Sequence, residues 1–239
     1  MDGITVLILA AAGYLLGSLS FARLVTAWLT HGRDVTQFEI PVADSAETYK
    51  VASIGGNAAS MALGARGGLL VSGLDILKVV VPTLTARLLF PAQPAYMLLA
   101  AGAGLAGHIW PIYHRFHGGS GFTPILAGLL VIDWPAALLL PAAGLLLGLL
   151  VFRNLIVASL AWIWLIIPWL WFRTNDPLYL AYAVGINLLF LLAMVPEARL
   201  ALKYERAGRQ AAYGQGNLQA TPMGRGLLKL AARLRISLR

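Results

Sequence analysis

Residues 108–121 read H-I-W-P-I-Y-H-R-F-H-G-G-S-G and lie between two long apolar runs. They contain three of the chain's four histidines, one arginine and three glycines. Glycine lets a ligand approach the backbone N–H groups closely, while arginine and imidazole side chains supply positive potential. This combination is typical of a site for phosphate or another anion. The alternative is a short membrane-surface loop that is turned by glycine and carries the basic residue usual on a cytoplasmic face.

The composition places the chain among membrane proteins. Hydrophobic residues make up 59% of its 239 residues, charged residues make up 12%, and the mean hydropathy is +0.76. A soluble domain carries about 25% charged residues. The absence of cysteine excludes disulfides, thiolate-bound metals and a cysteine nucleophile. Because the chain has four histidines and ten carboxylates, we expect no dedicated metal site and no cofactor.

Membrane spans dominate the hydropathy pattern. A spanning helix needs about 20 mostly apolar residues, and the run at the N-terminus is too long for a signal peptide. The pattern predicts an all-α membrane protein, a bundle of seven transmembrane helices. The N-terminus is expected outside and the C-terminus in the cytoplasm, because most lysines and arginines then lie inside. The expected spans are residues 4–29, 67–89, 94–113, 121–133, 135–152, 154–172 and 177–195.

The positive charge gathers at the C-terminus. Residues 196–239 hold nine lysines and arginines against two glutamates, which is +7 of the net +8. Residues 225–239 place leucines at helical spacing between cations, which predicts a basic amphipathic helix on anionic lipid. Nucleic-acid binding is the rival interpretation, and the membrane context argues against it. We therefore expect a membrane domain over residues 1–196 and a basic cytoplasmic tail over residues 197–239.

The segment before the second span differs from the rest of the chain. Residues 30–50 form an acidic loop, and residues 51–65 are rich in alanine, glycine and serine. The second stretch is too weakly hydrophobic to cross a membrane alone. It is predicted to be re-entrant or partly buried against the bundle, where small residues allow backbones to approach closely.

Asp75 and Lys78 lie near the middle of the second span. Ionisable side chains are costly at that depth unless they are paired or face water. Because they are three residues apart on a helix, they share a face and can pair. They are either part of an active site or proton relay, or an internal ion pair that fixes packing. His108 has similar alternatives: it orients a phosphate, donates a proton or bonds a neighbouring helix. Asn187, Ser18 and Ser20 are expected to form hydrogen bonds between helices.

Two short motifs far apart in the chain are the segment 17–21 (G-S-L-S-F) and the segment 74–78 (L-D-I-L-K). They resemble Gly-Ser-Ile-Pro-Phe and Leu-Asp-x-Leu-Lys of one family, the bacterial membrane acyl-phosphate:glycerol-3-phosphate acyltransferases of the PlsY type. The segments 107–111 and 116–121 resemble its Gly-His-x-Phe-Pro and Phe-x-Gly-Gly-Lys-Gly elements. The match runs in order from about residue 10 to residue 195.

The resemblance implies a cytoplasm-facing site in the bacterial inner membrane. There an acyl group would pass from acyl phosphate to the 1-hydroxyl of glycerol 3-phosphate, giving lysophosphatidic acid. Acyl phosphate is already activated, so no protein nucleophile is needed and catalysis depends on positioning and electrostatics. The resemblance makes a cradle for phosphate from Ser53, Asn57, His108, Gly118, Gly119, Ser120 and Gly121.

Several positions depart from the family pattern. Ser120 stands where the family has a lysine, and Met61 stands where it has an arginine. After the last span the chain also lacks the family's His-Arg-x-Asn element. Each lost charge-assisted contact to phosphate is worth about 1.5–3 kcal/mol. Two functions therefore stay open: an acyltransferase with altered or lost catalysis, and a non-catalytic membrane subunit that uses the bundle as a scaffold within a larger complex.

Overall fold

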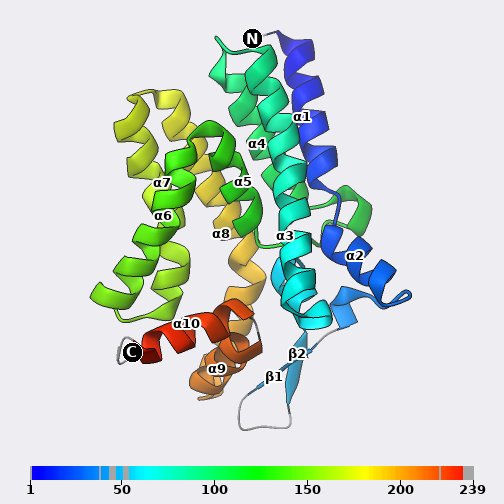
Figure 1. Ribbon diagram of the computed structural model, residues 1–239, viewed down its shortest axis with the longest axis vertical. Helices are drawn as coiled ribbons and strands as arrows, with labels where there is room; N and C mark the ends of the chain where they lie inside the picture. Colours follow the sequence, from blue (N-terminus) through cyan, green and yellow to red (C-terminus); the bar gives the residue numbers. More distant parts are fainter. Residues whose placement is uncertain (1, 38, 43–46, 51–53, 221, 234–239) are drawn as a thin grey trace.

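The computed structural model describes residues 2–37, 39–42, 47–50, 54–220 and 222–233 of the chain. Helices account for most of this part (Figure 1). The α-helices are α1 (Gly3–Gly17), α2 (Phe21–Leu29), α3 (Gly56–Leu89), α4 (Pro94–Ile109), α5 (Phe122–Ile132), α6 (Trp134–Leu146), α7 (Leu155–Thr174), α8 (Pro177–Arg206), α9 (Gln210–Ala220) and α10 (Pro222–Arg233). Shorter elements are the 3-10 turns η1 (Val35–Gln37) and η2 (Ile112–His114), the π-helical turn η3 (Leu147–Val151), and the strands β1 (Glu39–Pro41) and β2 (Thr48–Lys50).

The expected first span, residues 4–29, contains two helices. α1 ends at Gly17 and α2 begins at Phe21, with Ser18, Leu19 and Ser20 between them. Ser20 has φ −93° and ψ 88°, which are not helical values. The hydrophobic run continues through this break, so the sequence pattern carries no signal for it. The break leaves backbone carbonyls without their helical partners, and such groups must be satisfied by other contacts inside a membrane.

Helices α1 and α4 pack against each other through small residues. A Cβ atom at Gly17 would collide with the backbone of Gly104, and one at Gly107 would collide with the carbonyl oxygen of Tyr14. The hydroxyl of Tyr14 donates to the carbonyl of Trp110, just beyond the end of α4 (2.8 Å). Glycine on both helices therefore allows the close backbone contact that is common between membrane helices.

Helix α3 is folded back near its start. Gly64 has φ 74° and ψ −178°, which divides the helix into a short first part and a long second part. A Cβ at Gly56 would collide with the hydroxyl of Ser72, and one at Gly68 would meet Ser60, so the two parts lie against each other. This confirms the prediction that the small-residue stretch within residues 51–65 packs on the bundle; residues 51–53 lie outside the described part.

Among the described residues, six segments are long and apolar enough to cross a membrane. The remaining expected span, 121–133, corresponds to α5, an apolar helix of 11 residues. Eleven residues rise about 16 Å, which is about half of the hydrocarbon core. Figure 1 shows the chain running up and down through α1, α3, α4, α5, α6, α7 and α8, with the N- and C-termini at opposite ends. The largest core cluster has members on each of the helices α4, α5, α6, α7 and α8, and it includes Leu105, Leu129, Ile163 and Phe190.

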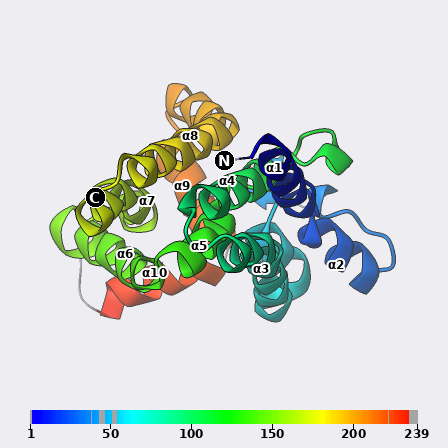
Figure 2. The same cartoon turned by 90° about the horizontal axis from the view of Figure 1, so that it is seen from above.

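A cap formed by β1, β2, α9 and α10 covers the end of the bundle where α8 ends (Figure 1). Strands β1 and β2 pair antiparallel, with Ile40 opposite Tyr49, and this small sheet departs from the all-α prediction. Tyr49 packs with Tyr204 from α8 and Tyr213 from α9. Figure 2 shows α10 lying below α6 and α5 and reaching toward α3.

The predicted amphipathic helix in the tail corresponds to α10, whose leucines pack on the bundle. Leu227, Leu228 and Leu230 lie against Leu149 in η3 and Leu155 at the start of α7. Leu234 and Leu238, which belong to the same predicted stripe, lie outside the described residues. Helix α8 continues without interruption from Pro177 to Arg206, through the position where we expected the membrane domain to give way to the tail.

Candidate functional site

A small polar cavity lies at the break between α1 and α2. Five separated segments contribute to it: the break itself, the residue Ile54 before α3, the middle of α3, the end of α4 and the loop before α5. The sequence motifs that are far apart in the chain therefore meet here. The lining residues are Gly17, Ser18, Leu19, Ser20, Ala22, Ile54, Asp75, Lys78, His108, Pro111 and Gly118.

Asp75 and Lys78 form the charged centre of this cavity. Their side chains are 2% and 3% exposed, and Nζ of Lys78 lies 2.8 Å from Oδ1 of Asp75, which confirms the predicted pairing. Nζ also donates to the carbonyl oxygen of Leu19 at the helix break (2.6 Å). The ring of Phe21 lies under the same ammonium, with its centroid 5.9 Å away. The break in the first span therefore supplies an acceptor for a lysine that is buried in the bundle.

His108 joins the pair from α4. Its Nδ1 lies 3.9 Å from Oδ1 of Asp75, which is too long for a hydrogen bond but close enough for the carboxylate to orient the ring after a small shift. The imidazole is buried, and a Cβ on Gly119 would collide with its Nε2. An acid, an ammonium and an imidazole thus lie together in a buried part of the bundle.

The glycines of the loop serve close packing. The N–H of Gly119 donates to the carbonyl of His108 (3.1 Å), and the N–H of Ile54 donates to the carbonyl of Gly118 (2.9 Å). The expectation of freely open N–H groups was therefore wrong at Gly119, because the loop folds back onto the end of α4. Gly118 lines the cavity, whereas Gly121 has φ +94° and begins α5 in a backbone conformation that favours glycine.

The other predicted residues lie around the cavity or away from it. Ser120 is half-buried in the loop, and Asn57 is exposed at the start of α3, where its carbonyl accepts from the hydroxyl of Ser60. Ser53 lies outside the described residues. Ser18 accepts a long hydrogen bond from the N–H of Ile112 (3.4 Å), and Asn187 bridges two helices by donating to the carbonyl of Ile163 (3.2 Å).

Arg23 is a candidate that the sequence motifs did not identify. Arg23 lies in the first turn of α2. Its guanidinium donates to the carbonyl oxygen of His117 in the loop (3.2 Å) and forms an ion pair with the carboxylate of Asp34 (3.4 Å). Burial raises the pKa of Asp34, but hydrogen bonds from Thr36 and the nearby Arg23 guanidinium outweigh it, so the pKa lies below its ordinary value of 3.8. Arg23 lies within the apolar run 4–29, and its contact with the loop depends on how distant segments pack, which is why it was not predicted.

The cavity is small. About 10 Å³ is open to a water-sized molecule, which is room for one water and far less than glycerol 3-phosphate needs. Among the described residues, no three acidic or histidine side chains gather closely enough to hold a metal ion. The arrangement can hold one proton acceptor, one ammonium and a bound water, and it must widen to admit a phosphate ester.

Comparison with known proteins identifies relatives of this chain. The family model described as glycerol-3-phosphate acyltransferase matches residues 7–204. The chain is 38% identical over 101 residues to glycerol-3-phosphate acyltransferase 1 of Moorella thermoacetica, covering 41% of this chain and 50% of that protein. It is 32% identical over 152 residues to glycerol-3-phosphate acyltransferase 1 of Dehalococcoides mccartyi, covering 62% and 67% of the two chains.

The chain spans only part of several such relatives, with 50%, 59% and 62% of their length covered in three cases. Its fold resembles crystal structures of PlsY, an integral membrane glycerol 3-phosphate acyltransferase, in a glycerol 3-phosphate form and a lysophosphatidic acid form. The TM-score is 0.67 at 24% identity, and 85% of this chain and 93% of the other are covered. At that identity the likeness establishes the multi-pass membrane fold.

Proposed function

Because this chain belongs to the glycerol-3-phosphate acyltransferase family, we propose that it transfers an acyl group from an acyl phosphate to a hydroxyl of glycerol 3-phosphate. The observation that carries the proposal is the meeting of Asp75, Lys78 and His108 around one cavity. These residues come from two motifs that resemble the family's own. The proposed enzyme would work with a site in which some residues of the family pattern are replaced, among them the positions of Ser120 and Met61.

The chemistry needs a proton acceptor and a cation. The hydroxyl oxygen attacks the acyl carbonyl carbon, an ester bond forms, and the bond from that carbon to the phosphate oxygen breaks. His108 would accept the hydroxyl proton, oriented by Asp75. Among its contacts with described residues, Lys78 uses two of its three N–H donors on Asp75 and Leu19, which leaves one for a substrate oxygen. Inorganic phosphate leaves with the proton that His108 had accepted, which returns the imidazole to its neutral form, and no covalent enzyme intermediate is formed.

The altered positions explain why we expect a weak enzyme. Ser120 provides no positive charge where the family has lysine. Met61 packs beside the tyrosine cluster of the tail, so its position has become part of the cap. Arg23, held against the loop at His117, is a cation that could take over contact with a phosphate when the cavity widens.

The test is a direct assay of the purified protein with palmitoyl phosphate and glycerol 3-phosphate, following lysophosphatidic acid and released phosphate together. We expect slow turnover that His108→Gln reduces at least about a hundredfold, because removing a general base costs that much. His31→Gln, at an exposed position, is the matched control. Ser120→Lys should raise the rate by restoring the missing cation. No product from either the natural chain or Ser120→Lys would reject the proposal.

A second function is favoured by the size of the cavity. We propose as the alternative that the bundle is a non-catalytic subunit of a larger membrane complex. A cavity that holds one water, with a charge pair that satisfies itself, also fits a packing device. Stoichiometric recovery of another membrane subunit after mild solubilisation, together with no turnover, would support this role. A monomeric protein with turnover would reject it.

The location and orientation complete the proposal. The relatives named above are bacterial, and we propose that this protein lies in the bacterial cytoplasmic membrane with its C-terminus inside. The tail over residues 197–239 would then face anionic lipid, and we propose no role in binding nucleic acid. The placement rests on the basic residues of the tail and on the resulting inside bias of positive charge.

A further inference from the structure

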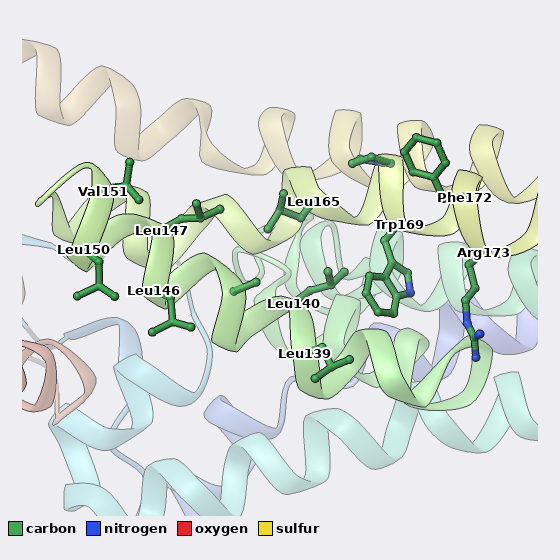
Figure 3. A pocket seen from close by; sticks show the side chains of 12 residues that line it. Leu139, Leu140, Leu146, Leu147, Leu150, Val151, Leu165, Trp169, Phe172 and Arg173 are labelled. Atoms are coloured by element: carbon green, nitrogen blue, oxygen red, sulfur yellow. The ribbon is translucent and has the colours of Figure 1, made fainter.

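An apolar groove runs along the outer face of the bundle between α6 and α7, away from the polar cavity. It has a volume of about 770 Å³ and a lining that is almost entirely aliphatic and aromatic. Figure 3 shows its side chains in a row, from Leu150 and Val151 at one end to Phe172 and Arg173 at the other. Arg173 is therefore the charged residue at the end of a groove that would otherwise suit any hydrocarbon.

The groove is long enough to hold an acyl chain, because it continues along the candidate span Trp134–Val151 to the far end of that span. Its wall on α6 and η3 extends from Leu139 to Val151, a rise of about 18 Å at the usual helical spacing. Half of the hydrocarbon core is about 15 Å thick. An acyl chain whose headgroup lies at Arg173 would thus fill the part of the groove nearest to that residue. The turn between α7 and α8 lies at the same end of the bundle as the N-terminus, as Figure 1 shows.

The polar end of the groove has donors for an anion. The Arg173 side chain is 58% exposed, and its Nε donates to Oδ2 of Asp133 (3.2 Å). That contact orients the guanidinium through one of its five N–H groups. Asp133 is itself committed, because its other oxygen caps α6 by accepting from the N–H of Ala136 (3.2 Å).

Trp169 adds a second donor one turn away from Arg173 on α7. Its ring lines the groove, and its Nε1 is buried without an acceptor in the part of the chain that the structure describes. A buried N–H is costly to leave unpaired. An ester oxygen beside Trp169, reached after a small movement of the ring, would satisfy it.

We infer that this groove binds a membrane phospholipid with an anionic headgroup, with one acyl chain along α6 and α7 and the phosphate against Arg173. The apolar wall alone would accept phospholipids of any charge. The guanidinium at its end adds a preference for a headgroup with net negative charge. The site is independent of acyl transfer, because it uses none of the residues around the polar cavity.

The experiment uses the full chain in detergent and native mass spectrometry, with equal amounts of phosphatidylglycerol and phosphatidylcholine that carry the same acyl chains. We expect one phosphatidylglycerol to be retained about tenfold more than phosphatidylcholine, as one charge-assisted contact predicts. Arg173→Gln should abolish this preference. Asp133→Asn breaks the same ion pair while keeping Arg173 and a cap acceptor, so it should keep the preference.

A steric pair of variants tests the apolar wall. Ala143→Trp fills the groove and should displace both lipids, whereas Leu138→Trp, on the exposed side of the same helix, should not. Equal retention of the two lipids by the natural chain would overturn the inference, as would an unchanged preference in Arg173→Gln. If Ala143→Trp instead converts a dimer to a monomer, the occupant is a second copy and the inference fails. Should Ala143→Trp not fold, the Arg173 and Asp133 variants decide alone.

Discussion

Asp75 and Lys78 place two charges in the buried interior of the bundle, and each charge lowers the cost of burying the other. A buried pair contributes little net stability compared with apolar residues of the same size, but removing one partner strands the other. The break after Gly17 adds the carbonyl of Leu19 as a further acceptor for Lys78. The cost of keeping charge at this depth is therefore shared among three groups, which explains how the site persists inside a membrane protein.

The mutual dependence of Asp75 and Lys78 predicts how variants of the pair unfold. Lys78→Met should lower the free energy of unfolding by about 3–5 kcal/mol, because Asp75 then lies buried without its cation. The double variant Asp75→Leu/Lys78→Met should recover much of that loss. The measurement is reversible unfolding in mixed detergent micelles, analysed as a double-mutant cycle. Costs that simply add would show that the pair is not coupled.

Asp34 predicts a dependence on acid. Its folded pKa lies below 3.8, because hydrogen bonds from Thr36 and the charge of Arg23 outweigh burial. The stability it contributes is therefore fully present above its ordinary pKa and is lost as the pH falls through the lower, folded value. Between pH 6 and about pH 3 the thermal stability of the natural chain should fall more than that of Asp34→Asn. Parallel curves for the two proteins would contradict this contribution.

Some contacts between residues of the site could be predicted from the sequence. The spacing of Asp75 and Lys78 predicts that they share a helix face, and they do pair. The motif around His108 was predicted to belong to the site, and His108 lies beside Asp75 and Lys78 at the polar cavity. The contact of Arg23 with the loop, and the bond from Gly119 to the carbonyl of His108, depend on how distant segments meet, and no local pattern encodes them.

At the scale of elements, glycine decides how closely α1 and α4 approach. A Cβ at Gly107 would collide with the carbonyl of Tyr14 and crowd the N–H of Ser18, at the break that lines the polar cavity. Gly102 lies on the same helix, and a Cβ there would meet nothing within 4 Å. The two positions therefore separate helix propensity from close packing.

Gly107→Ala should destabilise the protein by about 1–3 kcal/mol, the usual cost of overpacking. Gly102→Ala should be neutral or stabilising by up to about 1 kcal/mol, because alanine favours a helix. Thermal unfolding in the same detergent compares the two. If both variants behave alike, the close approach of α1 and α4 does not control stability.

The elements also show where hydropathy is informative and where it is not. Long apolar runs predict the positions of α4, α6, α7 and most of α8, since hydrophobic length alone decides them. The divided first span has no hydropathy signal. The β-hairpin has no recognisable sequence pattern either, because its strands have three residues each. They are stabilised by packing of Tyr49 on the tail.

At the scale of the whole molecule, the tail connects parts of the bundle that are distant in sequence. Its first part packs on the hairpin through Tyr213, and α10 packs on η3 and the start of α7 through its leucines. The sequence predicted an amphipathic helix on lipid. The structure uses the same apolar stripe against protein, because η3 and the start of α7 present a matching apolar surface.

Neighbouring alanines on α10 test this arrangement and the orientation of the chain together. Ala231 is 2% exposed and Ala232 is exposed. Because the chain contains no cysteine, Ala231→Cys and Ala232→Cys each introduce a single thiol. In inside-out vesicles a membrane-impermeant maleimide should label Ala232→Cys at least about tenfold faster, since only an exposed thiol is accessible to the reagent. In intact cells neither should react. Equal rates for the two would mean that α10 is not docked, and labelling from outside would reverse the proposed orientation.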